Sequence, residues 1–407
     1  MEEVKYNKVA LILVVLISFF ILVHPPFVIS IYVPIFVRVP LFLCIVFFSL
    51  STIIFRKYFT RVFAPILLFF IISAVYWIFT GAIFQEVVYS LLYVLLSIAL
   101  MLSVKRNNSL KLLLINFYFI LVILLAILSI LSFLAFNLDL APYTLKPVGE
   151  GDDVYRYFHN YFLGYINPKV FESGVIGRVC GFLFEPSYQG WFLSTNFFLL
   201  PKWIKNKGYL ILAQITVFFG ALSSFSTMSW VVFAIVFASI IGFKLMSILS
   251  FREKTANIIY SLTLLVGILT IFTVVDQDKL FEALGPSSSE DRTNRLDTSS
   301  LFLFTASLVQ LLMGRGPGFI GKNSDRGESN PIVKSLVENG LIVTILVIIF
   351  VISSTYKSKY YMIANLLWLN SVVILFTPLF IVNVLVCRWL ADRESKNLKN
   401  TNELREE

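Results

Sequence analysis

Long apolar runs separated by short polar segments recur along the whole 407-residue chain. A run of about 20 apolar residues is long enough to cross a bilayer as a helix. A spanning segment must satisfy its own backbone hydrogen bonds, so the pattern predicts helices. We therefore predict an all-α, polytopic membrane bundle of about twelve transmembrane helices. Their predicted positions are residues 9–23, 39–55, 62–79, 87–104, 112–136, 188–201, 208–222, 228–249, 258–275, 332–353, 360–375 and 376–390.

Three features of the apolar pattern need separate interpretation. The apolar stretch 299–313 is short for a span, and we interpret it as an interfacial or re-entrant helix on the outer side. If it did span, the topology after it would be inverted. The last two predicted spans are also short, and Pro378 near their junction predicts a tight hairpin or a broken helix. Lys5 and Lys8 precede the first run without a small-residue cleavage site, which predicts an uncleaved first span.

Basic residues assign the two sides of the predicted bundle. Lysines and arginines gather in alternate loops, at residues 56–61, 105–111, 202–207, 252–254 and 357–359. The opposite short loops hold almost none, and Arg38 is the one basic residue of residues 24–38. The positive-inside rule then places both termini in the cytoplasm, with residues 391–407 as a cytoplasmic tail. The chain is predicted to be one membrane domain, residues 1–407.

Two long loops, residues 137–187 and 276–331, fall on the predicted outer (periplasmic) side and carry most of the acidic residues. Long loops in a compact protein are usually functional.

Composition supports a membrane protein and excludes several function classes. Hydrophobic residues make up 58% of the chain and charged residues 14%, against about 25% charged in soluble domains. The net charge of +9 fits loop orientation and contact with anionic membrane lipids, so we expect no nucleic-acid partner. The cysteines form no disulfide framework, and no His/Cys cluster suits zinc. Carboxylate pairs at 152–153 and 276–278 are weak candidates for a divalent cation, and we expect no metal or cofactor.

Candidate chemistry begins with residues 178–188, at the end of the first long loop. Arg178, Glu185 and Ser187 place a cation, a carboxylate and a hydroxyl just before an apolar run. Pro186 suits the first turn of a helix, which puts Glu185 at or beside the N-cap. The alternative is that Arg178 anchors to lipid headgroups and Glu185 only caps the helix.

The second long loop supplies further cations. Arg292 and Arg295 are three positions apart and share a face if they are helical. Together with Arg178 they could hold a pyrophosphate, because guanidinium groups bind phosphate in a bidentate manner. Solvated or headgroup-bound arginines are the alternative. Residues 314–318, Gly-Arg-Gly-Pro-Gly, form either a turn or a backbone approach to a ligand, with Arg315 as a further cation.

Other polar residues lie near the same predicted surface. Asn330, Glu338 and Asn339 flank the start of the next span, and an ionisable residue at membrane depth is a functional candidate. His159 could act as a base, or it could pack or stack against a sugar. The first loop is also rich in aromatic residues, which suit sugar rings and equally the membrane interface.

The motif Arg178-x-x-Gly181-x-x-x-Glu185-Pro186-Ser187 resembles a stretch of the O-antigen polymerases, the Wzy family. The serine-rich turn 223–226, the segment 292–318 and the Glu-Asn-Gly-Leu at 338–341 resemble further parts of that family. The resemblance is specific over roughly residues 175–345. The related O-antigen ligases usually carry a histidine shortly before the Glu-x-Gly. Asn330 is the nearest match here, and no histidine follows His159, which favours a polymerase.

The resemblance implies a glycosyltransferase of the bacterial inner membrane in lipopolysaccharide O-antigen synthesis. Its substrates would be oligosaccharide repeat units on undecaprenyl pyrophosphate, and its partner a chain-length regulator. It would need to orient an acceptor hydroxyl and stabilise charge on the departing pyrophosphate. Arginines 178, 292 and 295, with Arg315 in reserve, suit that task. Glu185 could take the hydroxyl proton or orient Arg178, and we favour the second role.

A flippase or transporter is the chief alternative from another class. Transporters place ionisable residues at the bilayer midplane and often show repeated halves. Here the polar chemistry lies in two loops on one predicted face.

Overall fold

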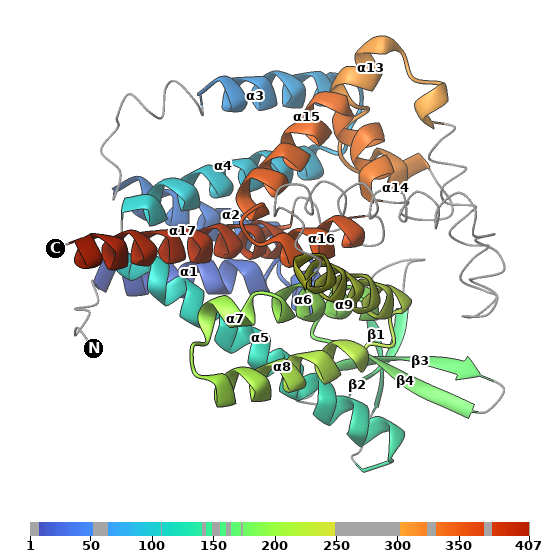
Figure 1. The fold of residues 1–407 in the computed structure, drawn as a ribbon. Coiled ribbons are helices and arrows are strands. Elements are labelled where there is room, and N and C mark those ends of the chain that lie inside the picture. The colour runs from blue at the N-terminus through green and yellow to red at the C-terminus, as the bar shows by residue number, and fades with distance from the viewer. Residues whose placement is uncertain are drawn as a thin grey trace.

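The computed structural model describes residues 8–51, 64–106, 108–140, 144–148, 155–159, 164–171, 174–248, 302–323, 331–369 and 377–406. These residues are mostly helical, with one small antiparallel sheet (Figure 1). The predicted span 258–275 and most of the predicted loop 276–331 lie outside the described residues. Each of the other predicted spans overlaps at least one helix of the described residues.

The elements of the N-terminal half alternate with short connections. They are α1 (Lys8–Leu22), the 3-10 helix η1 (Val28–Tyr32), α2 (Ile35–Ser51), α3 (Ala64–Phe79), α4 (Phe84–Arg106) and α5 (Asn108–Asn137). The middle of the chain forms β1 (Thr144–Val148), β2 (Tyr155–His159), β3 (Tyr165–Phe171) and β4 (Gly174–Gly181). Four helices follow the sheet: α6 (Pro186–Phe197), α7 (Leu200–Trp203), α8 (Lys207–Leu222) and α9 (Thr227–Ile248).

The C-terminal half contains two short helices and three longer ones. They are α13 (Leu308–Met313), α14 (Phe319–Asn323), α15 (Pro331–Thr355), α16 (Lys359–Trp368) and α17 (Pro378–Glu406). Pro378 is the first residue of α17, a position where proline costs no hydrogen bond. Helix α17 also runs on through most of the predicted cytoplasmic tail.

Several helices have the composition of membrane segments. Three are long and apolar enough to cross a bilayer: Asn108–Asn137, Thr227–Leu245 and Ile332–Thr355. Five shorter apolar helices accompany them among the described residues. Large apolar side chains such as Phe79 and Phe36 are exposed on the outside of the helices, which suits contact with lipid. The chain is therefore a helical membrane protein, and α13 is too short to span.

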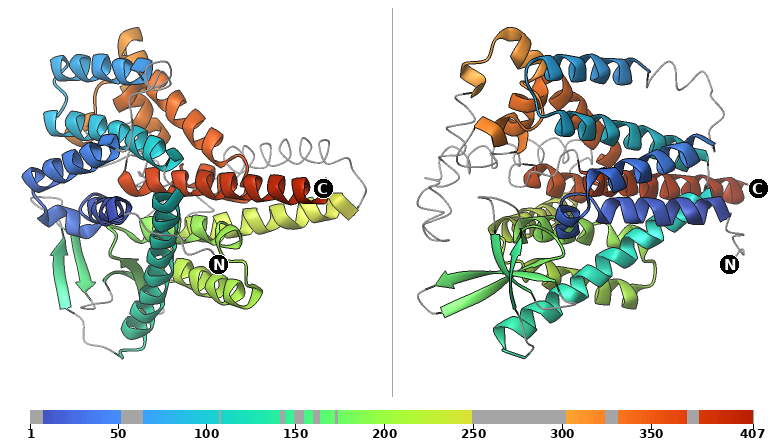
Figure 2. Two further views of the ribbon diagram at one scale, coloured as in Figure 1. Left: turned by 90° about the vertical axis from the view of Figure 1, so that its left-hand side faces the viewer. Right: turned by 180° about the vertical axis from the view of Figure 1, so that it is seen from behind.

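The two ends of the molecule differ in what they carry. Both chain termini lie at one end, whereas the sheet, α13 and α14 lie at the other (Figure 1). The view from behind in Figure 2 shows the same separation. At the end near the termini, the Lys202 amine donates a hydrogen bond to the Lys357 carbonyl (3.3 Å), and Lys357 pairs with Asp392 (3.6 Å). Loops predicted to share the inner side are thus neighbours in space.

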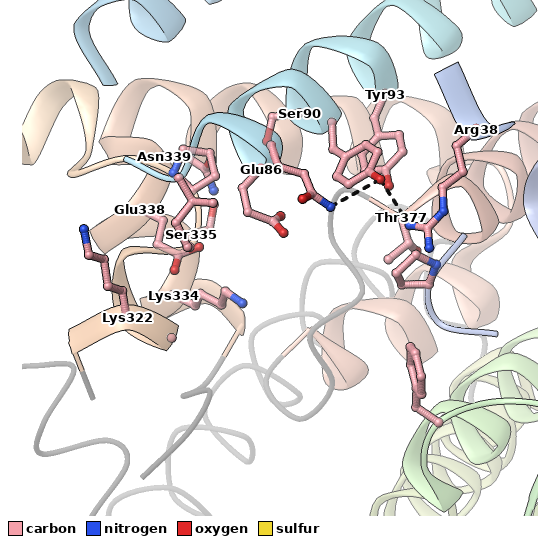
Figure 3. A pocket seen from close by; sticks show the side chains of 18 of the residues that line it. Arg38, Glu86, Ser90, Tyr93, Lys322, Lys334, Ser335, Glu338, Asn339 and Thr377 are labelled. Atoms are coloured by element: carbon pink, nitrogen blue, oxygen red, sulfur yellow. Dashed lines mark hydrogen bonds between the residues drawn. The ribbon is translucent and has the colours of Figure 1, made fainter. Parts of the chain in front are cut away.

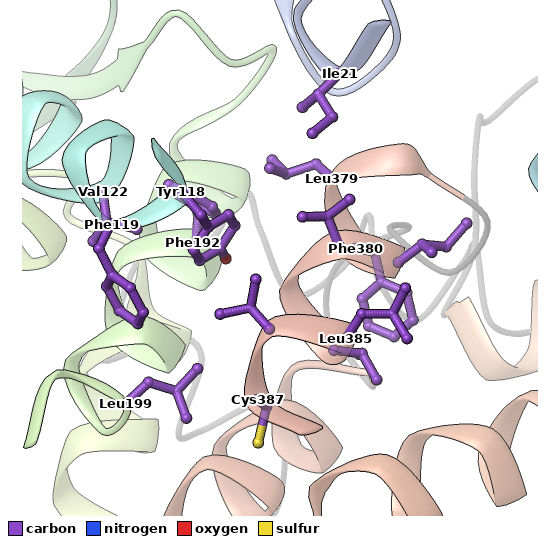
Figure 4. Close-up of a cluster of buried hydrophobic side chains, with 14 of the residues drawn as sticks. Ile21, Tyr118, Phe119, Val122, Phe192, Leu199, Leu379, Phe380, Leu385 and Cys387 are labelled. Carbon is purple, nitrogen blue, oxygen red and sulfur yellow. The ribbon is translucent and has the colours of Figure 1, made fainter. Parts of the chain in front are cut away.

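The apolar core lies where α1, α5, α6 and α17 meet (Figure 4). Ile21, Phe119, Phe192 and Leu385 come from these four helices and are buried there. Burying an aromatic or leucine side chain contributes about 1.5–3 kcal/mol in water, but lipid is itself apolar, so close packing and polar ties carry more of the stability here.

Buried polar side chains tie the helices of this core together. The Tyr118 hydroxyl on α5 donates to Asn383 Oδ1 on α17 (2.7 Å) and accepts from Asn196 Nδ2 on α6 (2.9 Å). On the other side of α6, Trp368 Nε1 on α16 donates to Ser194 Oγ (2.8 Å). Hydrogen bonds of this kind link helices in membrane proteins.

The all-α prediction needs one correction, at residues 144–181. This part of the predicted first loop forms a four-stranded antiparallel sheet in the order β1-β2-β3-β4. The strands are rich in aromatic and β-branched residues, which favour extended backbone. In an irregular loop the backbone N–H and C=O groups would need other partners. Here they pair across the strands. The sheet holds Arg178 opposite Asn167 and leads the chain into α6.

Candidate functional site

A pocket of about 700 Å³ opens at the end of the molecule that carries the predicted outer loops. Figure 3 shows side chains from α2, α4 and α15 around this space, with Lys322 of α14 at its outer edge. Phe184, just before α6, and Tyr188, in its first turn, also line the pocket. Segments far apart in the sequence therefore share one cavity, and backbone hydrogen bonds explain how they are held.

The first of these backbone contacts fixes the start of α6. The Val28 N–H donates to the Phe182 carbonyl and the Phe184 N–H donates to the Pro26 carbonyl, both at 2.9 Å. These bonds join the predicted short outer loop, residues 24–38, to the segment that follows β4. They place Phe184 and, one turn later, Tyr188 on the pocket wall.

Glu185 is the N-cap of α6, as predicted, and Pro186 follows as the first helical residue. The Glu185 side chain makes no capping hydrogen bond; its Oε2 accepts from the Ser187 hydroxyl (2.9 Å). Glu185 is exposed and Ser187 is half-buried. Neither lines the pocket, although residues on both sides of them do.

Arg178 lies on β4, away from the pocket lining, and is half-buried. Among the described residues no ion pair joins it to Glu185, and its buried Nε has no hydrogen-bond partner. Both charges nevertheless act on Cys180. Burial raises the pKa of the Cys180 thiol, Arg178 lowers it and Glu185 raises it further. Val179, which lies between Arg178 and Cys180, donates its N–H to the Ser223 carbonyl (3.1 Å). This hydrogen bond joins the sheet to the serine-rich turn 223–226.

The glycine segment 314–318 packs directly on the backbone of α15. The N–H groups of Arg315 and Gly316 donate to the carbonyls of Val337 and Glu338, both at 2.8 Å. Gly314 has φ +82°, and a Cβ there would lie 2.2 Å from the Glu338 carbonyl oxygen. This close approach of two backbones explains Gly314, whereas a Cβ on Gly316 would lie 2.4 Å from Ala82 Cβ. Pro317 and Gly318 then reach the pocket wall.

The Arg315 side chain is engaged away from the pocket lining. Its guanidinium donates to the Phe302 carbonyl (3.0 Å) and the Thr305 hydroxyl (3.1 Å). It also lies over the rings of Phe302 and Phe319, at 5.8 and 5.1 Å from their centroids. These contacts indicate that Arg315 fastens α14 to residues 302–305.

Glu338 lines the pocket and is only 3% exposed. Its Oε1 accepts a hydrogen bond from the Ile320 N–H (3.0 Å) in the first turn of α14. A carboxylate at a helix start is stabilised by the N–H groups and dipole there. Asn339 follows on the lining, and Gly340 leaves helical geometry with φ +80°, so α15 kinks at the pocket.

Four charged pocket residues were not predicted as candidates from the sequence: Arg38 on α2, Glu86 on α4, Lys322 on α14 and Lys334 on α15. With Glu338, the lining has three basic and two acidic side chains. The only available signal was that Arg38 breaks the absence of basic residues in the loop 24–38. The others were ordinary polar residues near predicted span ends.

Arg38 is held in place by two protein groups. Its guanidinium donates to the Ser30 carbonyl and to the Tyr89 hydroxyl (3.3 Å), and it lies 5.7 Å from the centre of the Tyr89 ring. Tyr89 in turn accepts from Gln85 (3.5 Å) and stacks on Tyr93 with centroids 6.1 Å apart. Among the described residues no carboxylate forms an ion pair with Arg38.

His24 supports this aromatic wall from behind. Its ring is fully buried, with edge contacts to Tyr89 (6.0 Å) and Tyr93 (5.7 Å). Nδ1 lies 2.8 Å from the Phe20 carbonyl oxygen, which fixes the proton on that nitrogen. Burial lowers the pKa of His24 to about 4. The histidine is therefore neutral near pH 7 and acts as a packing residue.

The remaining predicted residues lie elsewhere. Arg292, Arg295 and Asn330 lie outside the described residues, as do the carboxylate pairs at 152–153 and 276–278. His159 ends β2 opposite Tyr165 on β3. Within the described ranges no group of three or more His, Cys, Asp or Glu side chains could hold a metal ion.

The geometry allows two chemical tasks in one cavity. Cations at Arg38, Lys322 and Lys334 can hold an anionic group such as a phosphate. Carboxylates at Glu86 and Glu338 can orient a hydroxyl or accept its proton. Tyr89 and Tyr93 close one wall of the cavity, with only 6% and 8% of each residue exposed. Comparisons of the chain with protein-family models, curated proteins and solved structures found no match.

Proposed function

We propose that this chain is an O-antigen polymerase, a membrane glycosyltransferase of the bacterial inner membrane. It would join undecaprenyl-pyrophosphate-linked repeat units at the periplasmic face, for lipopolysaccharide O-antigen or a similar surface polysaccharide. Both termini would be cytoplasmic, and a chain-length regulator would be its partner. The observation that carries the proposal is the cavity lined by cations, carboxylates and tyrosines at the end with the predicted outer loops.

The reaction needs little from the protein beyond binding and charge stabilisation. Pyrophosphate is a good leaving group, so the donor sugar is already activated. Cations beside it stabilise the charge that grows on the departing oxygen, and fixed geometry removes the entropy of bringing two substrates together. The pocket residues Arg38, Lys322 and Lys334 suit the first task, and the carboxylates suit the orientation of an acceptor hydroxyl.

Residues 178–188 support the proposal by position. They carry the resemblance to the polymerase family, and Phe184 and Tyr188 belong to the cavity. Glu338 and Asn339, from the second family-like motif, lie in the same cavity. Arg178 and Glu185 stay candidates for an extension of the site, together with the undescribed Arg292 and Arg295.

An O-antigen ligase is the second candidate. A ligase would also bind an undecaprenyl-pyrophosphate-linked sugar chain, and the cavity would suit it equally. The sequence lacks a histidine after His159, which favours the polymerase. A flippase is the third, and the gathering of pocket charges at one end of the bundle counts against it.

The test is deletion of the gene in its host, followed by gel electrophoresis of the surface lipopolysaccharide. Cores that carry a single repeat unit are expected, because ligation continues without polymerisation. Bare cores with polymer accumulating on the lipid carrier would instead identify a ligase. Bare cores with no polymer outside the cell would identify a flippase.

A further inference from the structure

The charged residues of the pocket are divided between two ends. Figure 3 shows Lys322 and Lys334 on one side with Glu338 and Asn339, and Arg38 on the other side near Thr377. The Glu86 carboxylate lies between the two groups. A single phosphate needs one cluster of cations, so this division calls for an explanation.

The Arg38 end has the features of a prepared anion site. Holding a half-buried guanidinium without a carboxylate partner is costly, and a bound anion would offset that cost. The Ser30 carbonyl and the Tyr89 hydroxyl fix the side chain without neutralising its charge. In the described part of the chain, its buried Nε has no hydrogen-bond partner.

The lysine end is built differently. Lys322 is exposed and comes from α14, which the Glu338 carboxylate holds through the Ile320 N–H. Lys334 is half-buried and lies one turn before Glu338 on α15. Flexible ammonium groups at a rigidly anchored helix suit an anionic group that must be exchanged. The two ends therefore differ in chemistry as well as in place.

We propose that the pocket holds two lipid-linked pyrophosphates at once, one at Arg38 and one at Lys322 and Lys334, with Glu86 between them as the catalytic base. This inference rests on the proposed function, because a polymerase uses two carrier-linked substrates. Glu86 takes the proton of the acceptor hydroxyl. The hydroxyl oxygen forms the new bond to the anomeric carbon of the donor sugar. The bond from that carbon to the pyrophosphate oxygen breaks, and undecaprenyl pyrophosphate leaves with the electron pair.

The central position of Glu86 has a structural basis. It lies in the first turn of α4, where the helix dipole favours a carboxylate. The Gly318 backbone packs close to its side chain: a Cβ on Gly318 would lie 3.3 Å from Glu86 Cγ. The glycine segment thus leaves room for the carboxylate while α14 carries Lys322 to the same cavity.

The first experiment counts bound lipids. The full-length protein in lipid nanodiscs would be titrated with undecaprenyl pyrophosphate and examined by native mass spectrometry. We expect two lipids per chain, one per chain for Arg38→Gln, and one for the double variant Lys322→Gln/Lys334→Gln. The matched control is Lys244→Gln. Lys244 is exposed near the C-terminal end of α9 and does not line the pocket, so this variant should keep two bound lipids. One lipid on the unaltered chain, or no loss in either variant, would overturn the two-site inference.

Two further experiments identify the anion that binds and test whether Arg38 has only a structural role. Inorganic pyrophosphate and phosphatidylglycerol should compete weakly; full competition by phosphatidylglycerol would mean a general headgroup site and would sink the proposal. Tyr89→Phe removes an anchor of Arg38 but keeps its charge, so it should weaken binding less than Arg38→Gln does. An equal loss in both would assign Arg38 a structural role.

The role of Glu86 is tested by Glu86→Gln. The variant should still bind two lipids while polymer formation falls by about 100-fold or more. Unchanged polymer formation would exclude Glu86 as the base. The gene deletion keeps the two proposals apart. Single-repeat cores in the deletion strain with one bound lipid per chain would support the polymerase proposal and reject the two-site pocket. Bare cores with two bound lipids per chain would support the two-site pocket and reject the polymerase proposal.

Discussion

Gly340 and Gly314 meet where the glycine segment crosses the kink of α15. A Cβ on Gly340 would lie 2.3 Å from the Leu312 carbonyl oxygen, and its φ of +80° disfavours any side chain. Gly340→Ala should therefore destabilise the protein by at least about 2 kcal/mol, because backbone atoms cannot move aside. Thermal unfolding in detergent measures the loss. Gly321→Ala, whose Cβ would meet no atom within 4 Å, should unfold like the unaltered protein, and equal losses would contradict the packing argument.

His24 makes stability depend on pH in a defined window. Burial lowers its pKa from 6.5 to about 4, so the unfolded chain binds a proton at a higher pH than the folded one. Its contribution is complete above about pH 6.5 and is lost as pH falls toward 4, by up to about 3 kcal/mol. Unfolding followed between pH 4 and 7.5 should show this slope. His24→Gln should flatten the slope; an unchanged profile would mean that other groups control it.

Single residues differ in how far the sequence alone could place them. Glu185 was predicted at the N-cap of α6 because Pro186 and the apolar run after it are local signals. Arg38 and Glu86 were not predicted as site residues, because only tertiary packing of α2 against α4 brings them to the pocket. Arg315 was predicted to bind substrate on residue type, whereas its contacts are to Phe302, Thr305 and Phe319.

At the scale of helices, the Tyr118 hydroxyl connects α5, α6 and α17 through Asn383 and Asn196. Tyr118→Phe keeps the buried ring and removes both bonds, so we expect a loss of about 0.5–2 kcal/mol. Unfolding in mixed micelles of increasing sodium dodecyl sulfate measures it. Tyr209→Phe, at a 70% exposed position on α8, is the matched control. No difference between the two variants would show that the buried bonds add nothing.

Helices and strands were predicted with different success for a physical reason. Helices such as α5 and α9 follow directly from apolar length, which the bilayer fixes. The sheet at residues 144–181 has no such constraint, and its aromatic residues fit a membrane interface as well as a strand. Antiparallel pairing between successive strands, as between Val148 and Tyr155 or between Phe171 and Gly174, decided between the two. The same applies to α17, whose polar C-terminal half continues a helix that hydropathy alone would end.

For the whole molecule, the pattern of basic loops predicted which segments lie at the same end as the pocket, and it did so for more lining residues than any motif. The predicted outer loops 24–38, 137–187 and 276–331 each contribute to one cavity, as does the short segment 80–86 between the predicted spans 62–79 and 87–104. Their assignment to one side followed from the order of the predicted spans and from the Lys and Arg residues of the opposite loops, and the cavity is an independent geometric result. The predicted inner residues Lys202 and Lys357 likewise meet at the other end.

That separation predicts which end of the molecule faces the outside of the cell. A membrane-impermeant maleimide should label Lys322→Cys in intact spheroplasts, because α14 lies beside the pocket. Lys244→Cys, near the end of α9 where Phe243 contacts Lys359, should react only after permeabilisation. A Cys44→Ser background removes the exposed native thiol, while Cys180 and Cys387 are buried. The reverse labelling would put the pocket on the cytoplasmic face. Carrier-linked repeat units on the outer leaflet could not reach it there, and the polymerase proposal would fail with it.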